Sequence, residues 1–333
     1  MDTTTLDRET GVWRNAGARV AEALLIRTQH SSPRGPGARL RVDDRGRMAG
    51  GVSMGCVEND LREHLLALLR GEGTARTVHY GMAFAESLEV GLSCGGEIDV
   101  WLRLLPDPLP VPPPGRSVRC VRLDPAGGEF FWRDGEPEPG GMRGMLERLE
   151  GIWKSGGTWT GQDAGGGRWF LEEVAPRPRL IIVGASPIAD SLCALATRTG
   201  WRVVVVDPRR EHARAERFPD AEAVIHKWPE EGLAAAGAST EDAVAVLAHD
   251  AKLDVPALVA ALRAGCRYVG LLGSAGTQAE RRRHLIEEEG VPADAVERIR
   301  GPIGLKELGA VEPAEIAVSI LAELIRCRRG RLG

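Results

Sequence analysis

Leu180-Ile181-Ile182-Val183-Gly184-Ala185-Ser186-Pro187-Ile188-Ala189 is the stretch that decides the fold of the second half of the chain. Its first four residues form a continuous apolar run, as expected of a strand that is buried on both faces of a parallel sheet. The glycine, serine and proline that follow indicate a turn into a helix, which we expect from about Ile188 to Thr199. In dinucleotide-binding folds this strand, turn and helix hold the phosphates of the ligand.

The same pattern continues to the end of the chain. Short apolar runs recur with helical patterns between them, at Val203–Val206, Ala223–Ile225, Ala243–Ala248 and Tyr268–Leu272. A last helix is expected from Pro313 to about Cys327. Strands that alternate with helices form parallel sheets covered on both faces. We therefore predict an α/β fold in which residues 179–333 form a Rossmann-like domain.

The turn after the first strand carries the candidates for nucleotide binding. Asp207 follows Gly184 by 23 residues, close to the spacing of about 20 at which an acid holds the ribose hydroxyls. Ser186 occupies the place of the second glycine, where its hydroxyl could donate to a phosphate. An acid at 207 favours NAD over NADP, although Arg209 and Arg210 weaken that preference.

Polar residues follow two later strands of the predicted sheet. His249 and Lys252 come after one strand, and Ser274 comes after the next. Ligands of open α/β sheets bind at the carboxyl ends of the strands. Ser274 is therefore a candidate for phosphate binding, and His249 and Lys252 are candidates for anion binding or proton transfer. The alternative is a polar loop that only caps a helix at Asp254.

Residues 1–105 form a predicted mixed α+β domain that carries two cysteines. Strands are expected at Val20–Thr28, Arg39–Val42 and Glu97–Leu105, with a helix over Val57–Leu69. Cys56 follows Gly55 and the glycines at 50 and 51, and Cys94 precedes Gly95 and Gly96. Glycine gives a cysteine no bulk to pack against and lets the backbone approach another group. Two such thiols indicate a soft or sulfur-bearing ligand, and the alternative is a pair of small residues in turns.

Residues 106–178 are expected to connect the two domains. Six prolines lie between 106 and 114, and glycines dominate from 156 to 167. Such a composition is typical of a stiff linker or an extended crossing segment. Within this region Val118–Leu123 and Glu129–Trp132 resemble a hairpin, and Met142–Trp153 resembles a helix.

The composition excludes several classes of protein. A formal net charge of -4 argues against nucleic-acid binding. The absence of a CxxC pair argues against a structural zinc site. With neither a signal peptide nor an apolar run of about 18 residues, we expect a cytoplasmic protein that does not enter a membrane. The remaining four cysteines are expected to be small buried residues, namely Cys120, Cys193, Cys266 and Cys327.

Taken together in order, these segments resemble the xanthine dehydrogenase accessory protein (XdhC/CoxI) family over some 290 residues. The first half resembles the family in the loop and strand from Thr28 to Val42 and in the two cysteine segments, 51–58 and 89–98. The second half resembles it in a series of short motifs: Val183-Gly184-Ala185, Val206-Asp207-Pro208-Arg209, His249-Asp250-Ala251-Lys252, Gly270-Leu271-Leu272-Gly273-Ser274, Gly301-Pro302-Ile303-Gly304-Leu305 and Glu315-Ile316-Ala317. The family usually has glycine where this chain has Met54, and commonly where it has Ser186.

The resemblance implies a chaperone that binds the molybdenum cofactor (molybdopterin), protects it and delivers it to a molybdenum hydroxylase of the xanthine dehydrogenase type. It implies that Cys56 and Cys94, with Gly55 and Gly95, bind the cofactor, since thiolates are soft ligands. It also implies a cysteine desulfurase as a second partner, and a homodimer as a possible state. On this view the chain is an accessory protein more than an enzyme, and no metal site of its own is expected. The alternative is an NAD(P)-dependent oxidoreductase on the same scaffold, with His249 or Lys252 in proton transfer. A redox-active pair of Cys56 and Cys94, or a metal site that adds His64 and His79, has less support.

Overall fold

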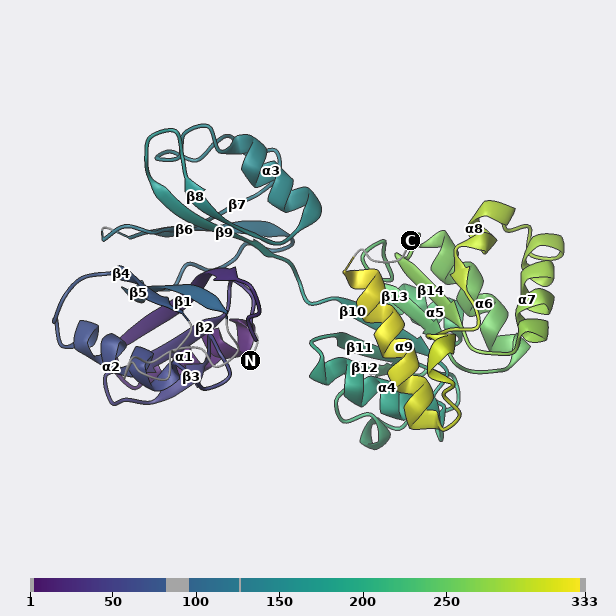
Figure 1. The fold of residues 1–333 in the computed structure, drawn as a ribbon. Coiled ribbons are helices and arrows are strands. Elements are labelled where there is room, and N and C mark those ends of the chain that lie inside the picture. The colour runs from purple at the N-terminus through teal and green to yellow at the C-terminus, as the bar shows by residue number, and fades with distance from the viewer. Residues whose placement is uncertain (1–2, 82–95, 126, 330–333) are drawn as a thin grey trace. The chain divides into compact units, whose positions relative to one another are not determined.

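The computed structural model describes residues 3–81, 96–125 and 127–329, which fall into two compact units, Met1–Pro176 and Arg177–Gly333 (Figure 1). Each unit has its own sheets and its own hydrophobic core. The predicted fold class is confirmed: antiparallel sheets with helices come first, and a parallel sheet with helices follows.

The first unit begins with a five-stranded antiparallel sheet in the order β3-β2-β1-β5-β4. Its elements are α1 (Thr3–Asn15), β1 (Val20–Gln29), β2 (Arg39–Asp43), β3 (Met48–Gly50), α2 (Glu58–Leu69), β4 (Arg76–Tyr80) and β5 (Glu97–Leu104). Helix α2 buries Leu61, Leu65, Leu68 and Leu69 against the sheet. This leucine face explains why the periodicity of the sequence located the helix so closely.

Residues 106–178, expected as a connecting region, carry a second sheet in the order β7-β6-β9-β8. Its elements are β6 (Ser117–Arg122), β7 (Glu129–Trp132), α3 (Leu146–Ser155), β8 (Thr158–Gln162) and β9 (Arg168–Val174). The two sheets of this unit meet through an apolar cluster that includes Leu24, Trp101 and Phe170. Beside that cluster Glu22 and Glu172 pair with buried arginines, among them Arg39. The expected hairpin is present as β6 and β7.

The second unit holds a six-stranded parallel sheet in the order β12-β11-β10-β13-β14-β15. Its elements are β10 (Arg179–Val183), α4 (Pro187–Arg198), β11 (Arg202–Val206), a 3-10 turn at Ala215–Arg217, β12 (Ala223–Ile225), α5 (Pro229–Ala235), β13 (Ala243–Val246), α6 (Ala251–Arg263), β14 (Tyr268–Leu271), α7 (Ala275–Glu287), α8 (Ala293–Glu297), β15 (Ile299–Arg300), a 3-10 turn at Lys306–Leu308 and α9 (Pro313–Arg328). Helices α4 and α9 cover one face of the sheet, and α5 to α8 cover the other (Figure 1). With β10 counted as strand 1, this is the strand order 3-2-1-4-5-6 of the Rossmann fold. The order in which strands are added to the sheet reverses between β10 and β13.

Within the described part of the chain, every helix is too short or too polar to cross a membrane.

Candidate functional site

The loop that carries Cys56 is built around one carboxylate, that of Glu58 in the first turn of α2. One carboxylate oxygen accepts the amides of Val52 and Ser53, at 3.1 and 2.7 Å. The other accepts the Ser53 hydroxyl at 2.5 Å and the Gly55 amide at 2.9 Å. Four bonds use all the acceptor positions that a carboxylate has. Burial alone would raise the pKa of Glu58, but these hydrogen bonds outweigh it and lower the pKa, so the loop is organised around an anion.

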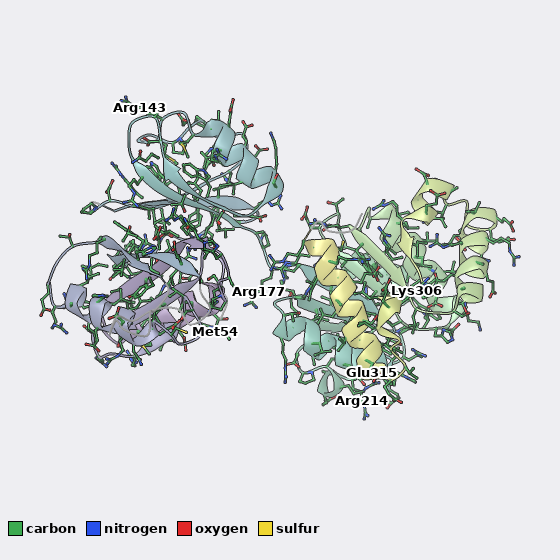
Figure 2. The ribbon with its side chains drawn as sticks, in the orientation of Figure 1. Met54, Arg143, Arg177, Arg214, Lys306 and Glu315 are labelled. Atoms are coloured by element: carbon green, nitrogen blue, oxygen red, sulfur yellow. The ribbon has the colours of Figure 1, made fainter. Side chains whose placement is uncertain are left out.

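Cys56 lies at the outer end of this loop and its side chain is exposed. Its amide donates to the Ser53 hydroxyl at 3.2 Å, which fixes the backbone beneath the thiol. Met54 is 79% exposed and lies at the outside of the unit (Figure 2). By contrast Cys120, Cys193 and Cys266 are buried as predicted, and burial raises the pKa of the Cys120 thiol to about 12. Cys56 therefore differs from these cysteines in having an exposed side chain.

Glycine is required immediately before the Cys56 segment by the close approach of another strand. A Cβ at Gly50 would collide with the carbonyl oxygen of Arg39. Gly55 is required for a different reason, since its φ is +109° although nothing lies within 4 Å of a Cβ there. The first glycine serves packing against β2 and the second serves the turn before the thiol.

The loop between β1 and β2 touches both cysteine segments. A Cβ at Gly96 would collide with the carbonyl oxygen of Ser31, and one at Gly51 would lie 3.8 Å from Nη1 of Arg34. Gly96 lies within the Cys94 segment, and Gly51 begins the Cys56 segment. Cys94 and Gly95 themselves lie outside the described residues, so their predicted role stays a prediction.

In the second unit, the turn after β10 is closed against β13. Gly184 has a φ of +101°, and a Cβ there would collide with the backbone of Ala248. This position therefore admits only glycine. Gly184 stands at the first glycine of the motif, which dinucleotide folds use for the tight turn, and here that turn lies in contact with the neighbouring strand end.

Asp207, predicted as a ribose-binding acid, is fully buried, and its carboxylate is already bonded. One oxygen accepts the Ala185 amide at 2.8 Å and Nη2 of Arg209 at 2.7 Å. The other accepts the amide and Nε of Arg209, each at 2.9 Å. Burial would raise the pKa of Asp207, but these bonds outweigh it and lower the pKa. The side chain of Arg209 is 40% exposed, so a cation is displayed where the sequence predicted an acid.

Ser186 is the N-cap of α4, and its hydroxyl oxygen accepts the Ala189 amide at 3.3 Å. Its own amide donates to the carbonyl of Gly184 at 3.0 Å, and Pro187 has no N–H. Most of the amides that a helix N-terminus offers to a phosphate are thus used or missing here. Ser186 retains the hydrogen of its hydroxyl group as a donor.

The remaining predicted residues lie at the same carboxyl edge of the sheet. His249 follows β13 in the left-handed region, with a φ of 56°. Lys252 is exposed in the first turn of α6, and its amide donates to the N-cap Asp250. Ser274 caps α7 by accepting the Thr277 amide at 3.2 Å. The fold therefore brings the candidate residues of this unit to one edge, in separate loops.

A buried carboxyl group beneath this edge was missed in the sequence. The helix begins at Ala251, so Asp250 is the cap, and Asp254 lies inside the helix with no exposed surface. Neither oxygen of Asp254 has a hydrogen bond from the residues that the structure describes, and Nε of Arg281 lies 3.6 Å away. Burial raises the pKa of Asp254 to about 6. The only signal in the sequence was an acid among apolar helix residues, which resembles an ordinary cap.

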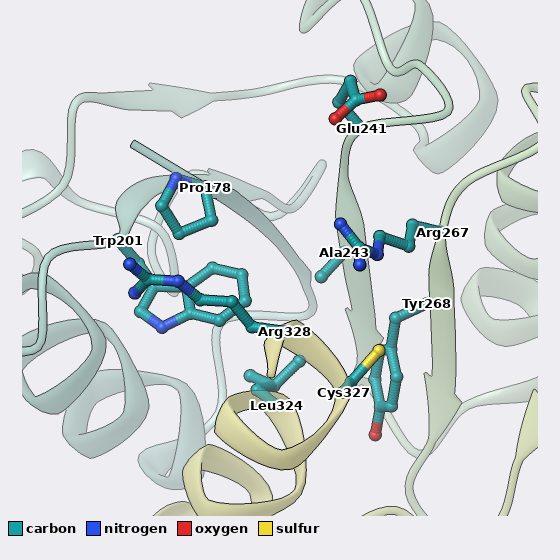
Figure 3. A pocket seen from close by; sticks show the side chains of 9 residues that line it. All are labelled: Pro178, Trp201, Glu241, Ala243, Arg267, Tyr268, Leu324, Cys327 and Arg328. Carbon is teal, nitrogen blue, oxygen red and sulfur yellow. The ribbon is translucent and has the colours of Figure 1, made fainter. Parts of the chain in front are cut away.

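A cavity lies at the opposite edge of the sheet, near the amino ends of its strands (Figure 3). Pro178, Trp201, Ala243 and Tyr268 precede or begin β10, β11, β13 and β14, and all four line it. Cys327 of α9 also lines this cavity. It is therefore separate from the carboxyl edge that carries the predicted residues.

Comparison with known proteins agrees with both halves of this description. The profile of the XdhC and CoxI family matches residues 13–81, and that of the XdhC Rossmann domain matches residues 180–324. A probable xanthine dehydrogenase subunit of Bacillus subtilis is 28% identical over 325 residues and 92% of each chain. The molybdenum cofactor insertion chaperone PaoD of Escherichia coli is 29% identical, over 91% of this chain and 82% of that protein.

A solved structure gives the same result for the fold. The crystal structure of a xanthine dehydrogenase from Bacillus halodurans superimposes with a TM-score of 0.74 at 26% identity, covering 98% of this chain and 96% of that one. With both units matched in order along the sequence, the chain belongs to the XdhC and CoxI family and carries the XdhC Rossmann domain.

Proposed function

We propose that this protein binds the molybdenum cofactor and delivers it to a molybdenum hydroxylase of the xanthine dehydrogenase type. The observation that carries the proposal is the exposed Cys56 thiol on a loop organised by Glu58. A ligand that binds such a loop does not have to order it first, which reduces the cost of binding. Thiolates are soft ligands, suited to a sulfur-rich molybdenum group. The relative named as an insertion chaperone for this cofactor supports the same function.

In this proposal the cofactor is cargo, and Cys56 holds it together with Cys94. A cysteine desulfurase would supply sulfur to the cofactor while it is held. Delivery requires no bond to be made or broken by the chain itself, so we propose an accessory protein, not an enzyme with its own turnover.

The saturated carboxylate of Asp207 gives no support to the alternative of an NAD(P)-dependent oxidoreductase. A ribose would have to displace the Ala185 amide or the guanidinium of Arg209. This geometry favours cofactor delivery over the oxidation of a substrate by a bound nucleotide.

The test is to mix the reduced protein with cofactor released from a molybdenum hydroxylase, and to pass the mixture over a desalting column. We expect molybdenum to elute with the protein and to activate a cofactor-free hydroxylase added afterwards. NAD and NADP are titrated in parallel by calorimetry. Saturable binding of either nucleotide without retention of molybdenum would contradict the proposal and favour the oxidoreductase.

A further inference from the structure

The Cys56 loop has few backbone donors left for an anion. The amides of Val52, Ser53, Gly55 and Cys56 donate to Glu58 or to the Ser53 hydroxyl. The preceding amide, that of residue 51, donates to the carbonyl of Arg39 at 2.7 Å. The glycines of this segment therefore do not form a phosphate cradle of the kind that successive free amides provide.

Arg34 carries N–H donors of the kind that the backbone of the Cys56 loop lacks. It lies in the loop between β1 and β2 and is partly buried. Its carbonyl accepts the Ser32 hydroxyl at 2.8 Å. Among residues 3–81, 96–125 and 127–329, its guanidinium has neither a hydrogen bond nor an ion pair. The buried arginines of the same unit, such as Arg41 and Arg103, are all paired with carboxylates. A partly buried cation without a partner is costly unless a ligand provides one.

The position of Arg34 connects it to the thiol loop. A Cβ at Gly51 would lie 3.8 Å from Nη1 of Arg34 and 3.2 Å from an oxygen of Glu58. Glu58 in turn accepts the amide next to Cys56, that of Gly55. The Arg34 guanidinium therefore lies close to the Cys56 loop.

We propose that Arg34 binds a phosphate ester group of the ligand whose sulfur-rich part is held at Cys56. This inference deepens the proposed function, since it names a specificity-determining residue of the same site. A guanidinium presents paired N–H groups that match two phosphate oxygens, which an ammonium group does not. Glu58 does not compete for Arg34, because its acceptor positions are filled by the loop.

The test uses pyrophosphate as the probe and needs no molybdenum. Iodoacetamide, a neutral reagent, alkylates the reduced protein, and mass spectrometry follows the Cys56 peptide with and without millimolar pyrophosphate. We expect pyrophosphate to slow alkylation of Cys56. Arg34→Ala should weaken this protection about tenfold or more in pyrophosphate concentration, and Arg34→Lys should retain part of it.

The matched control is Arg70→Ala, which removes the same charge from the far end of α2, where Arg70 pairs with Glu72. It should leave the protection unchanged. Hydrogen exchange at the Gly55 amide checks that the loop is intact in each variant. Absence of protection in the unmodified protein, or equal protection in Arg34→Ala, would overturn the inference. Retention of the cofactor is measured separately, so failure at Arg34 can be distinguished from failure of the proposed function.

Discussion

The Cys56 loop of the first unit and the Gly184 turn of the second are organised in the same way but expose different groups. Each is organised by a carboxylate whose acceptor positions are all filled, Glu58 in one and Asp207 in the other. Glu58 binds the loop's own amides and hydroxyl, so the loop displays a thiol. Asp207 binds a guanidinium, so the turn displays a cation. An acid in a motif position can therefore serve as a scaffold for the residue that contacts the ligand.

The largest difference is expected between two glycines with similar backbone angles. Gly184→Ala adds strain at a φ of +101° and a clash with the Ala248 backbone, so unfolding free energy should fall by about 3–4 kcal/mol. Gly55→Ala adds strain alone and should cost about 1–2 kcal/mol. Urea denaturation of the full chain measures both, and hydrogen exchange assigns each loss to its unit. Equal losses would mean that the Gly184 turn is not closed against β13.

Asp207→Ala should have the next largest effect. It leaves the Ala185 amide buried without an acceptor and releases Arg209, and we expect a loss of about 2–3 kcal/mol. Arg209→Ala should cost less than about 1 kcal/mol, because that side chain is partly exposed. Thermal denaturation of the two variants tests whether the acid acts as a scaffold. A smaller effect for Asp207→Ala than for Arg209→Ala would show that it does not.

Glu58, which is only partly buried, should contribute less to stability than Asp207. Glu58→Gln should cost about 1–2 kcal/mol, since a charged acceptor is lost. Because the folded pKa of Glu58 is lowered, its contribution is complete above the ordinary glutamate value of about 4.3 and is lost as the pH falls through the lower folded pKa. Hydrogen exchange at Gly55 between pH 3 and pH 6 should show this loss in the unmodified protein. Protection that does not change over this range would contradict the role of the carboxylate.

Much of the fold could be predicted, because the decisive signals are local. The apolar runs predicted β10 to β14 closely, and the leucine face predicted α2. The sheet of residues 117–174 was only partly recognised. Its strands β8 and β9 flank the glycine-rich stretch around residue 165, which by composition resembles a linker. That sheet is stabilised by distant contacts, such as Arg39 with Glu172. Such contacts are invisible in a single sequence.

The site could be predicted to the level of segments but not of contacts. Cys56 is predicted as a ligand-binding thiol because glycines around a thiol are unusual. The roles of Glu58 and Arg34 depend on loop geometry. The role of Asp207 depends on which donors bind its carboxylate in the folded chain. Arg209 is two residues away and donates its amide, Nε and Nη2 to this carboxylate, an outcome that motif spacing does not reveal.

The most direct test of the central claim is the dissociation constant of the molybdenum cofactor for three proteins: the unmodified chain, Cys56→Ser and Cys327→Ser. Cys327 is a matched control, because it is partly buried in α9 of the other unit. We predict that Cys56→Ser weakens binding about tenfold to a hundredfold, as the loss of one strong contact implies, while Cys327→Ser binds as tightly as the unmodified chain. Equal affinity in Cys56→Ser and the unmodified chain would contradict the account.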